Sequence, residues 1–431
     1  MMKRVIAAFA LAALAAPAVS HAQSLNEDLR HLIGTNPRIL SAQRTFDAAR
    51  DAQQRAWGAF LPTVDLSANS GYDRVDSPSR RTQGRSPKTL NTDGLTLSLT
   101  QNVFDGFRRT SNYDGARIQT SIQDTTLEAT RQAVMFEGIT AYLDVLRHTQ
   151  LVDLARKNER TIQQQLNLES ERVQRGGGMA VDALFARSRL QIGRERLVAF
   201  EGALNDALSR YHQVFGKRAV PELMIDPLPP AQLMPATLED AIRIAEGGNP
   251  NRIVSGLQVD LADKRRTTAA SDYYPRVDLV ARNSSERNID GTEGERREFT
   301  AFVRVTWELF SGFQTRASVS EAAQLHGAAQ NNHGFTSRKV VEETRLAWNE
   351  MSVARERVRL LENAVNIASE VFDARDRLRR AGRETAINVL DAENEVYNAR
   401  INYAQAAYDG RRAIYRLLQA MGMVTPANFG I

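Results

Sequence analysis

Three stretches of the chain alternate between apolar and polar residues, which is the pattern of a β-strand with two unlike faces. They cover residues 64–69, 95–100 and 299–309, and the first of them reads VDLSAN. Stretches of this kind, separated by polar loops, predict pairs of neighbouring strands. We therefore expect two β-hairpins, at residues 62–104 and 275–310.

The length of these strands fits two environments. The alternating runs have the length of tilted membrane strands, about 9–11 residues. A soluble sheet with one covered and one solvated face shows the same alternation. The alternation alone therefore does not decide between a membrane sheet and a soluble sheet.

Outside the hairpins, the apolar residues recur with the period of a helix. Positions three or four apart are apolar at Phe136, Ile139, Leu143 and Leu146. No proline interrupts residues 110–175, and a helix of that length would span roughly 100 Å. Such a helix is too long for a globular domain and is typical of a coiled coil. We expect two long α-hairpins, with tips near residues 176–182 and 382–391.

The same architecture occurs twice along the chain. The segment that starts at Ser24 matches the segment that starts at Thr237, and both contain an Asn-Pro pair. Further on, VFDGF in the first copy corresponds to LFSGF in the second, and Gly176 corresponds to Gly382. Matches in the same order indicate a duplicated helix–hairpin–helix unit.

The first residues have the composition of a secretory signal peptide. Lys3 and Arg4 precede an apolar run, and Ser20-His21-Ala22 forms an A-x-A-like cleavage site. The apolar run is too short to span a bilayer, so we expect the mature chain to leave the cytoplasm. The expected organisation is a signal peptide at 1–22, repeat 1 at 23–213, a proline-rich linker at 214–248, repeat 2 at 249–422 and a short tail at 423–431.

Composition and motifs exclude several functions. The chain has no cysteine, which rules out disulfides and thiolate chemistry, and its net charge of +5 is spread over a mixed surface. Nucleic-acid binding therefore has no support. The six histidines form no H-x-x-x-H pair, and no nucleotide-binding or serine-hydrolase motif occurs. We expect no enzymatic activity, cofactor or metal.

Four strands per chain are too few to close a membrane barrel, because about eight form the smallest barrels. Sheet edges that face lipid are not tolerated, so a membrane sheet would have to close between chains. Three chains would supply twelve strands, an even number within the observed range, although two or four chains also fit.

The signal peptide, the duplicated unit, the FDGF and FSGF motifs, and the glycine turns before VDAL and INVLDA resemble the TolC family of outer-membrane efflux proteins. The resemblance covers the chain from Ser24 to Gly422. It implies an α+β membrane fold: a homotrimer in the outer membrane of a Gram-negative bacterium, with a twelve-stranded β-barrel on a long periplasmic α-barrel. The linker would be equatorial. Besides outer-membrane lipid, the implied partners are a periplasmic adaptor protein and an inner-membrane ABC transporter or other pump.

The resemblance also implies roles for residues at the tips. In the family, two aspartates three positions apart form a negatively charged ring at the second tip. Asn388 and Asp391 occupy these positions here, so we expect a weaker, cation-selective ring. An ordinary solvated aspartate is the alternative. Gly176 and Gly382 correspond to tip glycines read by the adaptor, or they simply end the helices.

The family's polar latch at the entrance is altered in this sequence. Its first-tip aspartate is present as Asp182, but its tyrosine position is Arg379 and its arginine position is Glu384, beside Arg383. We expect an Asp182–Arg379 salt bridge in the closed state, and exposed pairs of this kind contribute ~0–1 kcal/mol.

The function expected from these features is that of an exit duct in a tripartite export system. The absence of a lipid-accepting cysteine slightly favours type I protein secretion. Multidrug or small-molecule efflux through the same kind of duct is the alternative within the family. From a different class, a secreted structural coiled-coil protein would explain the helices but not the alternating strands.

Overall fold

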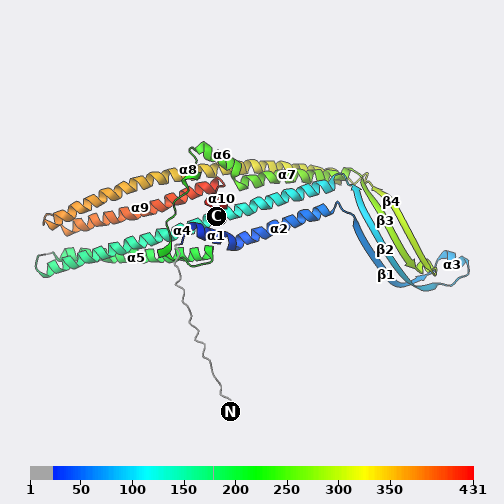
Figure 1. Cartoon of the computed structure of the whole chain (residues 1–431), viewed down its shortest axis with the longest axis horizontal. Helices are drawn as coiled ribbons and strands as arrows, with labels where there is room; N and C mark the ends of the chain where they lie inside the picture. Colours follow the sequence, from blue (N-terminus) through cyan, green and yellow to red (C-terminus); the bar gives the residue numbers. More distant parts are fainter. Residues whose placement is uncertain (1–22, 178) are drawn as a thin grey trace, which may run out of the picture.

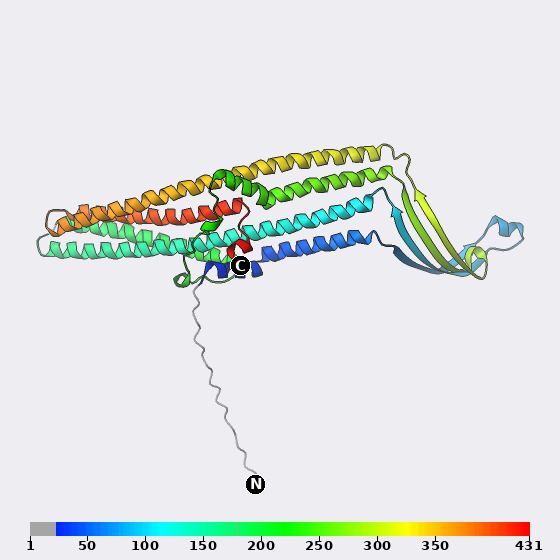
Figure 2. The same cartoon turned by 45° about the horizontal axis from the view of Figure 1, so that its top comes forward.

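The computed structural model describes residues 23–177 and 179–431. The expected signal peptide at residues 1–22 lies outside the described residues. The molecule is elongated, with a β-sheet at one end and the tips of two helical hairpins at the other (Figure 1). A second view shows that the sheet bends away from the direction of the helices (Figure 2).

Each repeat contains two helices, a β-hairpin and a long α-hairpin in the same order, which confirms the duplicated unit; the short helix at residues 78–82 is an addition in the first hairpin. Repeat 1 consists of α1 (Leu25–Thr35), α2 (Pro37–Gly58), β1 (Thr63–Val75), α3 (Pro78–Thr82), β2 (Lys88–Phe104), α4 (Arg108–Gln174) and α5 (Ala180–Phe215). Repeat 2 begins earlier than the expected residue 249, because α6 (Leu238–Gly248) is the counterpart of α1 and shortens the linker. After α6 come α7 (Pro250–Ala270), β3 (Arg276–Arg287), β4 (Glu295–Thr306), α8 (Gln314–Arg380) and α9 (Ala386–Ala420), followed by α10 (Pro426–Phe429). Within residues 23–431, Gly178 aside, no helix has the length and apolar character needed to cross a membrane.

The first helices of the two repeats begin in the same way. The hydroxyl oxygen of Ser24 accepts a hydrogen bond from the Glu27 amide, and Thr237 accepts one from the Asp240 amide. Each hydroxyl satisfies an amide that would otherwise lack a partner at the helix start. Asn36 caps α2 and its counterpart Asn249 caps α7, each directly before a proline. Proline fits the first position of a helix because its missing N–H is not needed there.

The sheet has the strand order β1-β2-β3-β4, and all neighbouring strands are antiparallel. Because β2 belongs to the first hairpin and β3 to the second, the two repeats share one sheet. The outer sides of β1 and β4 pair with no other strand of the described chain. Each chain therefore has two open sheet edges.

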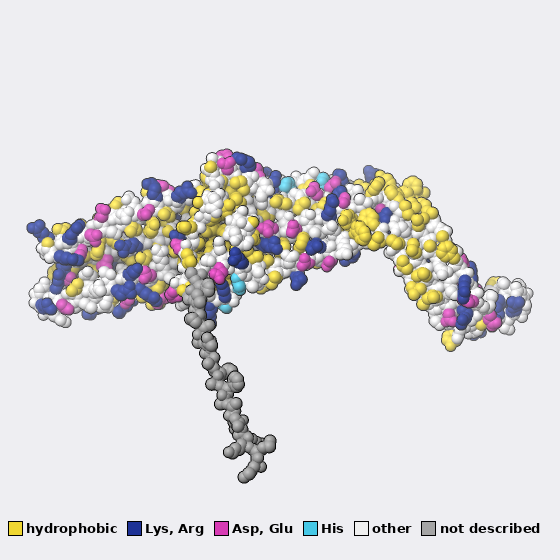
Figure 3. Space-filling view, in the orientation of Figure 1, with side chains coloured by type: hydrophobic (Ala, Val, Ile, Leu, Met, Phe, Trp, Pro, Cys, Tyr) yellow, Lys and Arg dark blue, Asp and Glu magenta, His cyan; other side chains and the backbone are white. Residues whose placement is uncertain are grey.

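The register collects apolar side chains on one face of the sheet. The facing pairs on this side include Val64 with Leu99, Leu66 with Leu97, and Leu279 with Val303. Leu66 is 67% exposed and Val303 is 59% exposed. Hydrophobic side chains gather over the sheet and over its junction with the helices (Figure 3). The predicted alternation is thus present, with a bare apolar face on one side.

Strand β4 is shorter than the sequence pattern predicts. It ends at Thr306, whereas the alternation continues to Leu309. The indole N–H of Trp307 donates to the carbonyl of Tyr273 over 3.2 Å, and the chain then turns through Phe313, whose φ is 66°. Trp307 and Leu309 therefore lie at the junction with the helices, beyond the strand.

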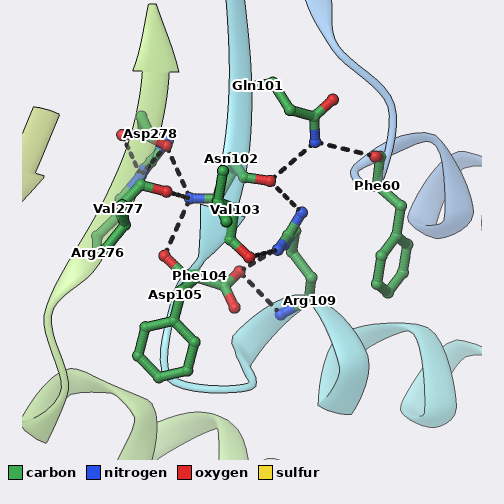
Figure 4. Close-up of polar contacts among 10 residues, drawn as sticks. All are labelled: Phe60, Gln101, Asn102, Val103, Phe104, Asp105, Arg109, Arg276, Val277 and Asp278. Atoms are coloured by element: carbon green, nitrogen blue, oxygen red, sulfur yellow. Dashed lines mark hydrogen bonds and ion pairs between the residues drawn. The ribbon is translucent and has the colours of Figure 1, made fainter. Parts of the chain in front are cut away.

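Polar contacts fix the sheet to α4 (Figure 4). The guanidinium of Arg109 donates to the carbonyls of Asn102 at 2.7 Å and Val103 at 3.0 Å, and to the carboxylate of Asp105 at 3.1 Å. The Asn102 amide donates to Asp278 on β3 at 2.7 Å, next to a register shift in β2. One side-chain cluster thereby joins both hairpins to the start of a long helix.

The main hydrophobic core lies where α1 packs against α4 and α5. Leu29, Leu32 and Tyr142 are fully buried there, and Phe215 is 1% exposed. Gly138 of α4 lets these helices approach closely. A Cβ atom at Gly138 would lie 2.6 Å from Cδ2 of Leu32 and 3.2 Å from Cδ2 of Leu29.

Replacing Gly138 with alanine should therefore lower the free energy of unfolding by about 1–3 kcal/mol, because the core must shift to admit the methyl group. Gly202→Ala is the matched control, since a Cβ there meets nothing within 4 Å. The control should be neutral or stabilise α5 by up to about 1 kcal/mol, the helix preference of alanine over glycine. The midpoint of thermal unfolding measures the stability of both variants. Equal midpoints would contradict the close packing described at Gly138.

Candidate functional site: the tips of the two helical hairpins

The two hairpins turn at the same end of the molecule, opposite to the sheet (Figure 1). Gly176 has a φ of 76° and Gly382 a φ of 72°, a region that favours glycine. The amide of Gly177 donates to the carbonyl of Arg172 at 3.0 Å, and the amide of Arg383 donates to that of Leu378 at 2.9 Å. Both turns therefore end their helices with the same hydrogen-bonded glycine motif.

A nearly buried salt bridge joins α4 to α8 close to the tips. The guanidinium of Arg379 lies 2.5 Å from Oε1 of Glu169, and the two side chains are 20% and 4% exposed. Arg379 also donates to the carbonyl of Glu384 at 3.2 Å. Removing one partner of a buried pair leaves an unpaired charge, so this contact holds the hairpins together more strongly than a surface pair would.

This arrangement corrects the expected Asp182–Arg379 pair. Asp182 lies in the first turn of α5 and is 6% exposed, and within the described residues its Oδ1 has no hydrogen-bond partner. Arg379 reaches α4 rather than α5, because Glu169 lies within range of its guanidinium. The structure thus brings Arg379 to a residue that the sequence comparison did not single out.

The other expected latch residues organise the second turn. The carboxylate of Glu384 accepts hydrogen bonds from the Asn388 side chain at 2.6 Å and from the Thr385 amide at 2.9 Å. Both bonds lower the pKa of Glu384, and the bond from Asn388 has the larger effect. Arg383 is exposed beside them. Glu384 and Asn388 therefore stabilise the start of α9.

Asp391 is compensated by a positive charge from the other hairpin. Its carboxylate lies 2.6 Å from the guanidinium of Arg189 on α5, and the two side chains are 52% and 36% exposed. An ion pair reduces the net charge that Asp391 presents to a passing ion. Asp391 therefore links α9 to α5, and the expected ring of charge stays a prediction.

Two further contacts tie the hairpins together along α5 and α9. Arg196 donates to the side-chain oxygen of Asn398 at 3.1 Å, and its guanidinium lies 5.8 Å from the ring centre of Tyr397. A small apolar cluster lies beside them, formed by Ile162, Leu166, Ala186, Leu190 and Leu390. The packing of the two tips against each other thus depends on a few polar links and one small core.

A regular apolar stripe on α8 has no cover within the described chain. It consists of Leu346, Val353, Leu360 and Ile367, which are spaced by seven residues and are each more than half exposed. A seven-residue apolar repeat is the seam of a coiled coil. This stripe therefore suits contact with another helix.

The acidic and histidine side chains of the described residues are not gathered around a metal position. In the part of the chain that the structure describes, no group of three or more His, Asp or Glu side chains is placed to hold a metal ion. The polar groups at the tips pair with one another instead.

Long paired helices attached to a sheet with a bare apolar face define a channel subunit that reaches from a membrane into the space beside it. The sequence profile of the family described as "Outer membrane efflux protein" matches residues 29–217 and 242–423. The chain belongs to this family. It is an outer-membrane protein of the Gram-negative envelope, and the predicted family and location are confirmed.

Three relatives show the breadth of the family. The chain is 25% identical over 377 residues to the outer membrane efflux protein BepC of Brucella suis, covering 87% of this chain and 80% of that protein. It is 24% identical over 433 residues to the outer membrane protein TolC of Vibrio cholerae, with coverages of 98% and 96%. It is 24% identical over 403 residues to the alkaline protease secretion protein AprF of Pseudomonas aeruginosa, with coverages of 91% and 83%.

Solved structures share the fold. The outer membrane protein VceC of Vibrio cholerae matches with a TM-score of 0.79 and 14% identity, covering 92% of this chain and 96% of that one. The CmeC outer membrane channel of Campylobacter jejuni matches with a TM-score of 0.80 and 14% identity, with coverages of 93% and 86%.

Proposed function

We propose that three copies of this chain form the exit duct of a tripartite export system. In this proposal a pump in the inner membrane and a periplasmic adaptor deliver the substrate to the helical tips. The observation that carries the proposal is the joining of a membrane-type sheet to helices of 67 residues. Helices of that length extend roughly 100 Å, enough to carry a duct deep into the periplasm.

The open edges of the sheet support assembly between chains. Lipid does not satisfy unpaired backbone N–H and C=O groups, so β1 and β4 each need a neighbour. Pairing β4 of one chain with β1 of the next closes the sheet without an edge. Three chains give twelve strands, wide enough for a channel and even in number.

The exposed stripe on α8 supports the same assembly in the helical part. We expect it to pack on a neighbouring chain as a coiled-coil seam. Val353→Lys should then abolish the trimer, because three lysines would be buried between helices. Ser352→Lys, at the adjacent exposed position, is the matched control and should assemble. Native mass spectrometry of detergent-extracted protein measures the oligomeric state of each variant. A Val353→Lys trimer as stable as that of the wild type would refute this seam.

The substrate is proposed to be a protein exported by a type I secretion system. The similarity to AprF, which is named for protease secretion, supports this choice, as does the absence of a lipid-accepting cysteine. The similarity to BepC, named as an efflux protein, supports small-molecule efflux as the second candidate. In either case the duct itself supplies no energy, and its chemistry is limited to opening and closing.

A deletion strain separates the two candidates. Loss of one or more proteins from the culture medium, with drug susceptibility unchanged, supports secretion. Increased susceptibility to several drugs with an unchanged set of secreted proteins supports efflux. A secreted structural rod would give neither phenotype, and it would not migrate as a heat-modifiable species from the outer-membrane fraction.

A further inference from the structure

A small cavity lies between α4, α5 and α9, just behind the tips. Its volume is about 110 Å³, and its lining includes Asn158, Arg189, Gly193, Arg196 and Glu393. It adjoins both polar links between α5 and α9 described above, since Arg189 and Arg196 form part of its wall. A change of charge inside this cavity can therefore alter the contacts that hold the hairpins together.

Glu393 is a buried carboxyl group without a partner in this cavity. Its residue is 8% exposed, and among the described residues its Oε2 accepts no hydrogen bond. Burying an unpaired carboxylate is unfavourable, so such a group tends to keep its proton. Glu169, which is also buried near the tips, differs from Glu393 because it is paired with Arg379.

The charged groups around Glu393 are engaged elsewhere. From α8 it faces Asp376, which pairs with Arg380 at 2.6 Å. From α5 come Arg189, paired with Asp391 at 2.6 Å, and Arg196, bonded to Asn398 at 3.1 Å. α4 contributes the uncharged Asn158, and α9 itself contributes Asn394. The two arginines of the cavity wall, Arg189 and Arg196, would each have to give up a present partner to pair with Glu393.

Burial, and after it the negative charge of Asp376, raises the pKa of Glu393 from 4.5 to about 7. In this packed arrangement the group therefore changes charge near neutral pH. Once exposed to water, it would titrate close to the ordinary value for glutamate.

We propose that Glu393 is a proton-operated switch of the entrance: its protonated form keeps the hairpins packed, and its ionised form loosens them. This inference rests on the proposed function and adds a regulation to the same tips. Ionised Glu393 is an unpaired charge where α4, α5 and α9 pack together, and burying such a charge makes the packed arrangement less favourable. The carboxylate also repels Asp376 and draws water into the cavity.

The direction of the pH effect follows from proton linkage. The packed state binds the Glu393 proton more tightly than the open state, so acid favours closing. Between pH 4.5 and about 7, opening should become more favourable as pH rises, by roughly three hundredfold in total. Outside this window the contribution of Glu393 is constant.

Hydrogen exchange at pH 5 and pH 8 tests the switch, after correction for the pH dependence of intrinsic exchange. In the wild type, protection of residues 160–195 and 375–400 should fall by about ten- to hundredfold from the lower to the higher pH. In Glu393→Gln, the same residues should stay protected from exchange at both pH values. Glu395→Gln, at an exposed position two residues further along α9, is the matched control and should behave as wild type. Asp376→Asn should move the transition to lower pH.

Loss of protection in Glu393→Gln to the same extent as in the wild type would overturn the proposal, as would a wild type whose protection does not change with pH. Because exchange reports the packing of the tips directly, this result does not depend on transport. Conductance measured on the same samples reports the proposed duct separately. A pH-dependent tip in a protein that conducts no ions would refute the duct and leave the switch intact.

Discussion

Replacing Glu169 with glutamine should open the entrance of the assembled channel. The change leaves the guanidinium of Arg379 with its bond to the Glu384 carbonyl but without a neutralising charge, in a place where it is 20% exposed. Breaking a buried ion pair in this way costs about 3–5 kcal/mol. A cost of 3 kcal/mol in each chain would shift the balance between closed and open tips by about a hundredfold. Cells that carry the variant should take up a large hydrophilic antibiotic to which the wild type is resistant.

Glu171→Gln provides the control for this variant. Glu171 lies two residues away on α4, has a side chain that is 60% exposed, and pairs with the exposed Arg175 at 3.5 Å. An exposed pair contributes about 0–1 kcal/mol, so this change should have little effect. Equal antibiotic uptake in both variants would show that the Glu169–Arg379 pair does not hold the entrance.

Replacing Leu97 with arginine should keep the protein out of the outer membrane. Leu97 points from the apolar face of β2, where it is 45% exposed. An arginine facing lipid near the middle of a membrane barrel costs about 2–4 kcal/mol, and a trimer would carry three of them. The amount of heat-modifiable protein in the outer-membrane fraction should fall to a small part of the wild-type amount.

Ser98→Arg separates the two faces of the same strand. Ser98 is adjacent to Leu97 and lies on the polar face, next to Asp65 of β1. An arginine on that face would meet water or polar groups in the channel, so assembly should be retained. The opposite result would be a Ser98→Arg variant absent from the outer membrane and a Leu97→Arg variant inserted normally. The apolar face of the sheet would then line the lumen, and the proposed barrel would be wrong.

The fold was predictable because its signals repeat over short distances. The alternation in residues 64–69 and the three- and four-residue spacing around Phe136 each depend on local geometry alone. Duplication then gave every signal a second copy. The end of β4 was not predictable in this way, because a hydrogen bond from Trp307 to Tyr273, 34 residues away, redirects the chain.

The contacts at the tips could be predicted only in part. The resemblance pointed to the correct turns and to Arg379, yet it paired Arg379 with Asp182 rather than Glu169. Glu169 and Arg379 are 210 positions apart, and their meeting depends on how two long helices are rotated about their axes. Nothing in the local sequence fixes that rotation, so Glu169 and Glu393 look like ordinary charged residues of a helix surface.

Single-channel recording of the purified protein in a planar bilayer tests the proposed duct most directly. The assembled wild type should give small currents from a nearly closed entrance, and Glu169→Gln should give larger currents from the same barrel. Asp391→Asn should change ion selectivity only slightly, because Arg189 already compensates Asp391. Assembled trimers that pass no current, in the wild type and in Glu169→Gln alike, would contradict the proposal that this chain forms an exit duct.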